Sequence, residues 1–255
     1  MIGHRGSTAA GCRENSVDAV LTAMALGADG VEVDVRLSSD GVLMCSHDAV
    51  VTTSLGRELT VSETSAAELI ARAARDADGH LATLPEVLAV LAAQGTSHVV
   101  VEAKPVADQI GAFRTARALA NLLVPLSNSM VITVSSFDPI LLGAVRRMVF
   151  GTRVRTAVLG PATESAVAVL RRADEAGDHE VHLSLKALRE SPHAVRMAHQ
   201  RGIAVTAWTV NGADLAEVAA LGVDAVITDH IAAARAAACL GASPLPVALA
   251  GVTAC

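Results

Sequence analysis

Short apolar runs rich in β-branched residues alternate with longer Ala- and Leu-rich stretches along most of the chain. Runs of this length are typical of buried strands, and the stretches between them are typical of helices. The predicted strands are residues 1–4, 30–35, 98–104, 130–135, 154–159, 180–184, 203–209 and 225–228.

Several predicted helices carry characteristic residues at their ends. Asn15 or Ser16 can cap a helix that stops at Gly27. Thr83 and Glu86 have the spacing of a capping box, in which each side chain binds the backbone of the other. Further boundaries are predicted at Asp138-Pro139 and Ser191-Pro192, which pair a cap with a first-turn proline, and at Gly202 and Gly222, which end helices.

Eight strand–helix units within about 240 residues favour an α/β fold of the (β/α)8 TIM barrel type over an open doubly wound sheet. We expect residues 1–240 to form one catalytic barrel domain. Residues 38–82 break the alternation with the hairpin-like sequence DGVLMCSHD, a polar stretch and a short helical pattern. This segment predicts a small insertion after the second strand.

The C-terminal end needs a separate prediction, because residues 236–255 contain no charged side chain and have about the length of a membrane span. The sequence GASPLP places Gly, Ser and two prolines in the middle of this stretch. We therefore predict residues 241–255 to be an apolar tail that is packed on the domain or disordered, rather than a membrane anchor. We expect no membrane association.

Composition narrows the classes of partner. Aromatic residues make up only 2% of the chain, so stacking on bases is not a main binding mode. The net charge is −6 and the basic residues are scattered, which argues against nucleic-acid binding. The four cysteines include no CxxC pair, so we predict free thiols in a reducing compartment, without a thiolate zinc site. With no signal-peptide pattern at the N-terminus, we predict a cytoplasmic location.

Acidic residues occupy the predicted carboxyl ends of neighbouring strands. Glu32 and Asp34 are two residues apart, so a strand directs both to one face, and Glu102 and Lys104 repeat this pattern. His4 ends the first strand. Active sites of such barrels lie at this rim, and we expect these side chains to converge there. Three carboxylates in one place predict a bound Mg²⁺ or Ca²⁺; ion pairs with rim arginines are the alternative.

A second histidine, His47, lies at the end of the inserted hairpin, where it can fold back over the rim towards His4. Two imidazoles that flank a phosphate can act in turn as general base and general acid. Arg5 and Lys104 can neutralise phosphoryl oxygens as charge builds in the transition state.

The sequence resembles the glycerophosphodiester phosphodiesterases from residue 2 to about residue 230. Single motifs such as HD are nonspecific, but their ordered combination is specific. The matching segments are HRG (4–6), EN (14–15), VEVDV (31–35), DG (40–41), HD (47–48), TLPEVL (83–88), EAK (102–104), SSFDP (135–139), WTVN (208–211) and GVDAVITD (222–229).

The resemblance implies a role for each matching residue. It implies metal-dependent hydrolysis of a small glycerophosphodiester to glycerol 3-phosphate and an alcohol. We expect Asp229 to be a helix cap or a supporting group, and Trp208 either to contact substrate or to belong to the core. The implied roles are a catalytic pair, His4 and His47; ligands of one divalent cation, Glu32, Asp34 and Glu102; phosphate contacts, Arg5 and Lys104; a glycerol contact, Trp208; and a supporting turn, Glu14 and Asn15.

The sequence departs from the family pattern around the insertion. Arg13 and Ser16 flank the Glu-Asn pair where the family often has Pro and Thr, and VVTTS follows His47 in place of an arginine–threonine pattern. The changes around the insertion leave the preferred alcohol open. The sequence also leaves open the choice of Mg²⁺ or Ca²⁺, the order of the two histidines and homo-oligomer formation. Two alternative functions remain: phospholipase D-like or sphingomyelinase D-like action on lysophospholipids, and a non-catalytic phosphodiester-binding barrel.

Overall fold

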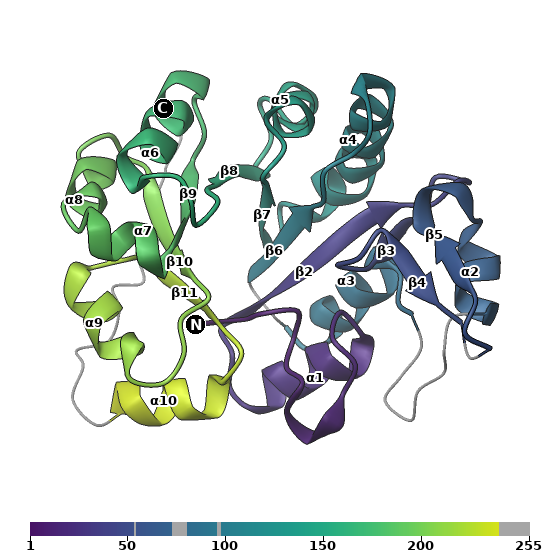
Figure 1. Ribbon diagram of the computed structural model, residues 1–255, viewed down its shortest axis with the longest axis horizontal. Helices are drawn as coiled ribbons and strands as arrows, with labels where there is room; N and C mark the ends of the chain where they lie inside the picture. The colour runs from purple at the N-terminus through teal and green to yellow at the C-terminus, as the bar shows by residue number, and fades with distance from the viewer. Residues whose placement is uncertain (54, 73–80, 96–97, 240–255) are drawn as a thin grey trace.

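The computed structural model describes residues 1–53, 55–72, 81–95 and 98–239. Eight parallel strands form a closed barrel in the order β1-β11-β10-β9-β8-β7-β6-β2, and the pairing of β1 with β2 closes it (Figure 1). This confirms the predicted (β/α)8 fold. The strands are β1 (Ile2–Gly3), β2 (Gly30–Leu37), β6 (His98–Ala103), β7 (Val131–Ser136), β8 (Arg155–Leu159), β9 (Glu180–Ser184), β10 (Ala204–Trp208) and β11 (Ala225–Thr228).

Helices surround the barrel and follow its strands. The principal ones are α1 (Val17–Ala25), α3 (Leu84–Ala93), α4 (Gln109–Leu123), α5 (Pro139–Met148), α6 (Ala166–Ala176), α7 (Leu185–Glu190), α8 (Ala194–His199), α9 (Asp214–Leu221) and α10 (Ile231–Cys239), with single 3-10 turns at Ala9–Gly11, Val61–Glu63 and Val124–Leu126. None of the helices in these described ranges is both long and apolar enough to cross a membrane. The predicted tail, residues 241–255, lies outside the described residues.

The predicted helix ends are observed at most positions. The Ser16 side chain caps α1, Thr83 and Glu86 form the capping box of α3, and Asp138 caps α5. The prediction for Ser191-Pro192 was wrong, because α8 begins only at Ala194. Ser191 instead ends the short helix α7, which the sequence pattern had not indicated, and its backbone N–H donates to the Ala187 carbonyl at 3.0 Å.

The segment after β2 adds a small lobe to one side of the barrel (Figure 1). It contains β3 (Leu43–Cys45), which pairs antiparallel with the end of β2, the hairpin β4 (Val50–Thr52) and β5 (Glu58–Thr60), and helix α2 (Ala66–Arg72). The lobe has its own apolar cluster, in which Met44, Val61 and Leu69 are buried. Its position beside β2 brings the connection from β3 to β4 to the carboxyl end of the barrel.

Strand alternation separates the two faces of the barrel wall. Val31, Val33 and Val35 of β2 are fully buried in a cluster shared with helix residues such as Val20 and Leu84. The intervening Glu32 and Asp34 therefore point into the barrel. Deeper in the barrel, apolar residues of β1, β6 and β11 form a small interior cluster that Trp208 joins. The fold thus places carboxylates above an apolar floor.

Candidate functional site

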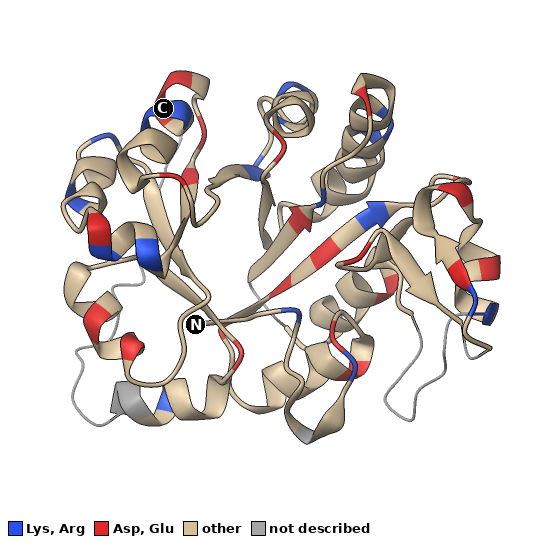
Figure 2. Cartoon of the chain, viewed as in Figure 1, with Lys and Arg blue, Asp and Glu red and all other residues tan. Residues whose placement is uncertain are grey.

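Acidic residues lie along β2 and near the carboxyl end of its neighbour β6, where Figure 2 shows red segments on both strands. The register of the two strands pairs Asp34 with Glu102. Each of Glu32, Asp34 and Glu102 offers an oxygen, and these oxygens all lie within 4.8 Å of one another. Glu32 and Asp34 are 3% and 1% exposed, so water does little to screen the repulsion between them.

The pKa values of the three carboxyl groups shift in different directions. Burial, followed by the charges of Asp34 and Glu102, raises the pKa of Glu32 well above its ordinary value. Burial and then Asp34 also raise the pKa of Glu102, an effect that Lys104 and His47 partly offset. For Asp34, burial raises the pKa, but the charge and hydrogen bond of Lys104, the hydrogen bond from Asn15 and the charge of Arg5 together lower it below its ordinary value.

Two basic residues hold the carboxylates in place. Lys104 Nζ lies 2.7 Å from Asp34 Oδ1 and 2.6 Å from Glu102 Oε1. Arg5 donates its backbone N–H to Glu32 Oε2 at 2.9 Å, and its Nε lies 3.2 Å from Asp34 Oδ2. Arg5 Nη1 also donates to both carboxylate oxygens of Glu14. The two cations predicted to contact phosphate are therefore located directly beside the acidic cluster.

The turn after β1 has a tightly specified backbone. Arg5 and Asn15 both have positive φ angles, of 53° and 58°. Asn15 tolerates this conformation well among non-glycine residues. Its side chain donates to Asp34 Oδ2 at 2.8 Å and accepts from the Asp34 backbone N–H at 2.9 Å. Asn15 thus fixes Asp34 from both its side chain and its backbone.

One buried oxygen of the cluster has no partner. Within the described part of the chain, no hydrogen bond reaches Glu32 Oε1. A desolvated carboxylate oxygen in this state is costly unless a cation binds it. An all-oxygen set with one unsatisfied ligand atom fits a hard divalent cation such as Mg²⁺ or Ca²⁺. The predicted alternative, ion pairs with rim arginines, is represented among the described residues by the Arg5–Asp34 contact, which leaves Glu32 Oε1 unsatisfied.

His4 lies immediately after β1, and its backbone N–H donates to the Thr228 carbonyl. Its ring Nδ1 is 2.7 Å from Asp229 Oδ1. The other carboxylate oxygen, Asp229 Oδ2, accepts a hydrogen bond from Asn211 Nδ2 at 2.8 Å. The hydrogen bond with His4 lowers the pKa of Asp229 to about 2, so this carboxylate is ionised at neutral pH. Asp229 therefore orients the His4 ring and leaves Nε2 as the ring nitrogen available for proton transfer.

His47 occupies the connection between β3 and β4, with its ring Nδ1 2.8 Å from Asp48 Oδ1. Its backbone carbonyl accepts a hydrogen bond from Arg36 Nε at 3.0 Å. Because Arg36 extends the alternating series of Glu32 and Asp34 on β2, this bond ties the His47 loop to the strand that carries two of the carboxylates. Sequence reasoning had not singled out Arg36, although the same two-residue spacing points to it.

Trp208 is at the carboxyl end of β10. Its indole N–H donates to the His182 carbonyl at 3.3 Å, and its ring meets Phe137 edge to face at a centroid distance of 5.7 Å. His182, on β9, is 1% exposed, and its ring Nε2 lies 3.3 Å from Glu180 Oε2 inside the barrel. Phe137 and Asn211 were not predicted as individual site residues, although both belong to motifs that carry the resemblance.

Comparison with known proteins gives a consistent assignment. The family model described as "Glycerophosphoryl diester phosphodiesterase family" matches residues 4–233. A glycerophosphodiester phosphodiesterase of Caldanaerobacter subterraneus is 47% identical over 51 residues, which are 20% of this chain and 21% of that protein. The matched segment thus spans only about a fifth of that relative's length.

Solved structures match over nearly the whole chain. The glycerophosphodiester phosphodiesterase of Thermotoga maritima is 26% identical, with a TM-score of 0.70 over 91% of this chain and 94% of that one. An Oleispira antarctica phosphodiesterase, solved in complex with the product sn-glycerol-3-phosphate, is 24% identical with a TM-score of 0.78. That match covers 92% of this chain and 95% of the other.

Proposed function

The chain belongs to the glycerophosphoryl diester phosphodiesterase family, and from this premise we propose that it hydrolyses a glycerophosphodiester to glycerol 3-phosphate and an alcohol. One observation carries the proposal. The family match coincides with a three-carboxylate cluster inside the barrel and with two histidines, His4 and His47, that each have an aspartate at Nδ1. Such a site combines cation binding with two proton-transfer groups.

In this proposal, Glu32, Asp34 and Glu102 would hold one divalent cation, and Glu32 Oε1 provides the ligand atom that otherwise lacks a partner. When bound, such a cation supplies Lewis-acid stabilisation of charge on phosphoryl oxygens. Arg5 and Lys104 add positive charge at the same rim, where they can stabilise the phosphoryl oxygens in the transition state. Trp208 would pack against the glycerol part of the substrate.

Proton transfer falls to the two histidines. One imidazole removes a proton from the attacking oxygen, which belongs either to water or to a glycerol hydroxyl. As the new P–O bond forms, the other imidazole donates a proton to the alcohol oxygen whose bond to phosphorus breaks. Asp229 and Asp48, each hydrogen-bonded to an Nδ1, fix the orientation of the two rings. Attack by a glycerol hydroxyl would give a cyclic phosphate that water then opens.

The direct test measures glycerol 3-phosphate release from glycerophosphocholine, glycerophosphoethanolamine and glycerophosphoglycerol, with added Mg²⁺ or Ca²⁺ and with chelator. We expect release only with metal. Choline release from lysophospholipid without turnover of any glycerophosphodiester would select the phospholipase D-like alternative. Metal binding without turnover of either class would leave a non-catalytic barrel.

A second measurement reads metal binding without activity. Calorimetric titration with Mg²⁺ or Ca²⁺ should give one site, and Glu32→Gln should abolish it. Glu190→Gln is the matched control, because Glu190 is an exposed carboxylate on α7 whose contact is a surface pair with Lys186 at 3.9 Å. Equal metal affinity in wild type and Glu32→Gln would remove Glu32 from the ligand set.

The free thiols of Cys12 and Cys45 agree with the cytoplasmic location that we propose for the enzyme.

A further inference from the structure

One side of the barrel carries most of the large apolar side chains that are exposed. It is the outer side of α4 and α5, two neighbouring helices that pack against each other (Figure 1). Among the described residues, six large apolar side chains are exposed, and four of them belong to this side. We call it the α4–α5 face and define it by Ile110, Phe113, Arg117, Ile140, Arg147 and Phe150, the last of which lies just after α5.

The spacing of these residues places them on the sides of the two helices that point away from the barrel. The buried residues of α4 are Ala112, Thr115, Ala116, Leu119 and Leu123. Ile110, Phe113 and Arg117 follow one another at intervals of three and four residues, so they share the opposite side of α4. Ile140 and Arg147 are separated by two helical turns and share one exposed side of α5. The two exposed stripes therefore run next to each other.

The aromatic residues make this exposure unusual. The chain has three phenylalanines and one tryptophan. Two of these four residues belong to the α4–α5 face, where Phe113 is 54% exposed and Phe150 is 89% exposed. Phe150 lies in a closed turn, in which the Thr152 backbone N–H donates to the carbonyl of the buried Val149 at 3.0 Å. Single exposed apolar residues are ordinary, but four on two adjacent helices are typical of an interaction surface.

The same face is basic, although the whole chain has a net charge of −6. Residues 109–155 include six arginines and a single carboxylate, Asp138, which caps α5. Two of these arginines pair with buried carboxylates elsewhere in the barrel. The exposed Arg117 and Arg147 have no ion-pair partner among the described residues. The α4–α5 face thus combines uncompensated positive charge with exposed apolar side chains.

An anionic membrane surface fits this combination. A bilayer takes up apolar side chains wherever they lie on a surface, and its anionic headgroups attract arginine. A protein partner would need a separate pocket for each of the spaced apolar residues. A second copy of this chain is disfavoured, because a symmetric contact would bring the arginines of two such faces together. We propose that the α4–α5 face binds membranes that contain anionic phospholipids, through insertion of its apolar side chains and contact of its arginines with headgroups.

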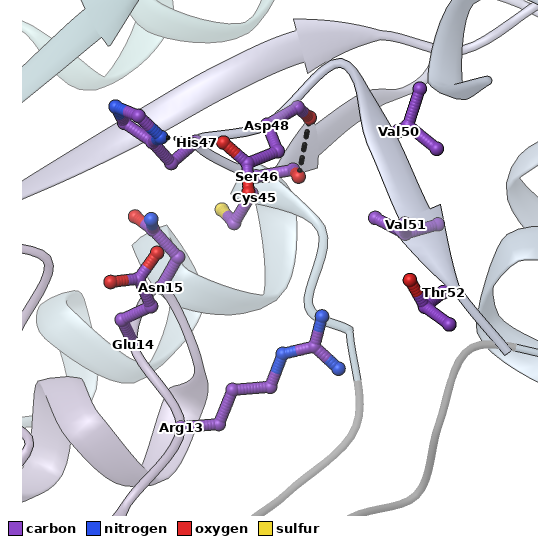
Figure 3. Close-up of a pocket in the computed structure, with 10 residues that line it drawn as sticks. All are labelled: Arg13, Glu14, Asn15, Cys45, Ser46, His47, Asp48, Val50, Val51 and Thr52. Atoms are coloured by element: carbon purple, nitrogen blue, oxygen red, sulfur yellow. Dashed lines mark hydrogen bonds and ion pairs between the residues drawn. The ribbon is translucent and has the colours of Figure 1, made fainter. Parts of the chain in front are cut away.

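Binding of this kind is peripheral and goes beyond the proposed hydrolysis. None of the helices in the described ranges could cross a membrane, and an interfacial face needs no spanning segment. The sequence-based expectation of no membrane association rests on the C-terminal end, which is not part of this face. The face is also separate from the polar cavity beside His47, whose walls include Glu14 and Asp48 (Figure 3). Substitutions on the face therefore leave the residues of the site in place.

The test measures binding of the full chain to vesicles by sedimentation. One set of vesicles contains phosphatidylglycerol and phosphatidylcholine in equal parts, and the other contains phosphatidylcholine alone. We expect binding to the mixed vesicles at low salt and little binding to the neutral ones. Phe150→Ser should weaken this binding by about tenfold, because the ring loses its apolar contact with the bilayer. Arg147→Gln should weaken it by about fivefold, and its difference from wild type should shrink at high salt.

Two exposed residues outside the face provide matched controls. Leu55, in the lobe, is 87% exposed, which is close to the value for Phe150. Arg196, on α8, is an exposed arginine without an ion-pair partner in the described part of the chain. Leu55→Ser and Arg196→Gln should bind the mixed vesicles as wild type does. Thermal unfolding should be unchanged in all four variants, because the substituted side chains are exposed.

Three results would overturn the proposal: no binding to the mixed vesicles, equal binding to both kinds of vesicle, or equal losses in the control variants and the face variants. A wild-type dimer that Phe150→Ser dissociates, with no vesicle binding, would assign the face to self-association instead. Because vesicle binding is measured without turnover, its outcome is independent of the hydrolase assignment. Failure to release glycerol 3-phosphate would count against the proposed function alone.

Discussion

Asp229 Oδ1 lies 2.7 Å from His4 Nδ1, across a sequence separation of 225 residues. The contact exists because β1 pairs with both β11 and β2, which closes the barrel and brings its first and last strands together. Asn211, in the connection after β10, accepts from the Asp229 backbone N–H and donates to the Asp229 side chain. The first proposed catalytic residue is thus oriented by the last strand of the fold.

Asp229→Asn should lower kcat by about 10²-fold or more while the protein stays folded. The amide keeps the shape of the carboxylate but cannot stabilise a positive imidazole ring, and its NH₂ group can face Nδ1 in place of an oxygen. The measurement is kcat across pH, together with thermal unfolding. A useful comparison is Asp224→Asn, which alters a second aspartate–histidine contact, with His199 at 2.9 Å, away from the site. Equal losses in both variants would indicate a general structural effect.

Glu180 should make the protein sensitive to acid. It is fully enclosed in the barrel, with Arg155 Nε at 2.9 Å, Thr133 Oγ1 at 3.0 Å and His182 Nε2 at 3.3 Å. Burial raises its pKa, but the hydrogen bond with His182 and the charges of Arg155, His182 and His98 together lower the pKa to about 2. Because the folded pKa lies below the unfolded one, Glu180 stabilises the fold above about pH 4.5, and this stability is lost as pH falls towards 2.

Glu180→Gln should therefore reduce the free energy of unfolding at pH 7 by about 3 kcal/mol, since it removes the buried charge that pairs with the partly buried Arg155. The difference from wild type should shrink at pH 3, where the wild-type carboxylate begins to protonate. Urea unfolding at the two pH values measures both. A pH-independent difference would mean that packing, and not ionisation, accounts for the loss.

The barrel and its acidic rim follow from local sequence features, whereas the supporting contacts do not. The two-residue spacing of Glu32 and Asp34 places both on one strand face wherever that strand lies. The Arg36 bond to the His47 carbonyl depends on how the lobe folds back, which no local pattern fixes. The edge-to-face contact of Phe137 with Trp208 similarly joins the residue after β7 to the last residue of β10, which are far apart in the sequence.

Gly6 should be far less tolerant of alanine than a comparable glycine elsewhere. Its φ is 81°, and an added Cβ would lie 2.6 Å from the Ala19 carbonyl carbon, in the backbone of α1. Gly177 has a similar φ of 72°, but an added Cβ there meets nothing within 4 Å. We expect Gly177→Ala to cost about 1 kcal/mol of unfolding free energy from backbone strain alone, and Gly6→Ala clearly more. Thermal and urea unfolding should show a larger loss of stability for Gly6→Ala than for Gly177→Ala. Equal losses of unfolding free energy would show that the backbone of α1 shifts freely to make room.

The last prediction concerns the metal-free protein and follows from the unsatisfied Glu32. Burial and the neighbouring carboxylates raise its pKa, so its folded pKa lies above the unfolded one. The stability it contributes is full below the unfolded pKa and is lost as pH rises through the folded pKa. With chelator present, wild type should lose stability as pH rises through that interval, whereas Glu32→Gln, which cannot ionise, should not.

Added Mg²⁺ or Ca²⁺ should prevent this loss of wild-type stability at higher pH. A ligand that binds only the folded state stabilises it in proportion to the logarithm of its concentration above Kd. Wild type then gains thermal stability with metal, and the gain grows with pH as the carboxylates lose their protons. Glu32→Gln should gain little at any pH. Urea unfolding of wild type and of Glu32→Gln, each with chelator and with metal, at several pH values, measures these differences in stability. If metal stabilised Glu32→Gln as much as wild type, the cation would bind elsewhere, and the repulsion among Glu32, Asp34 and Glu102 would have to be relieved by protonation of Glu32 alone.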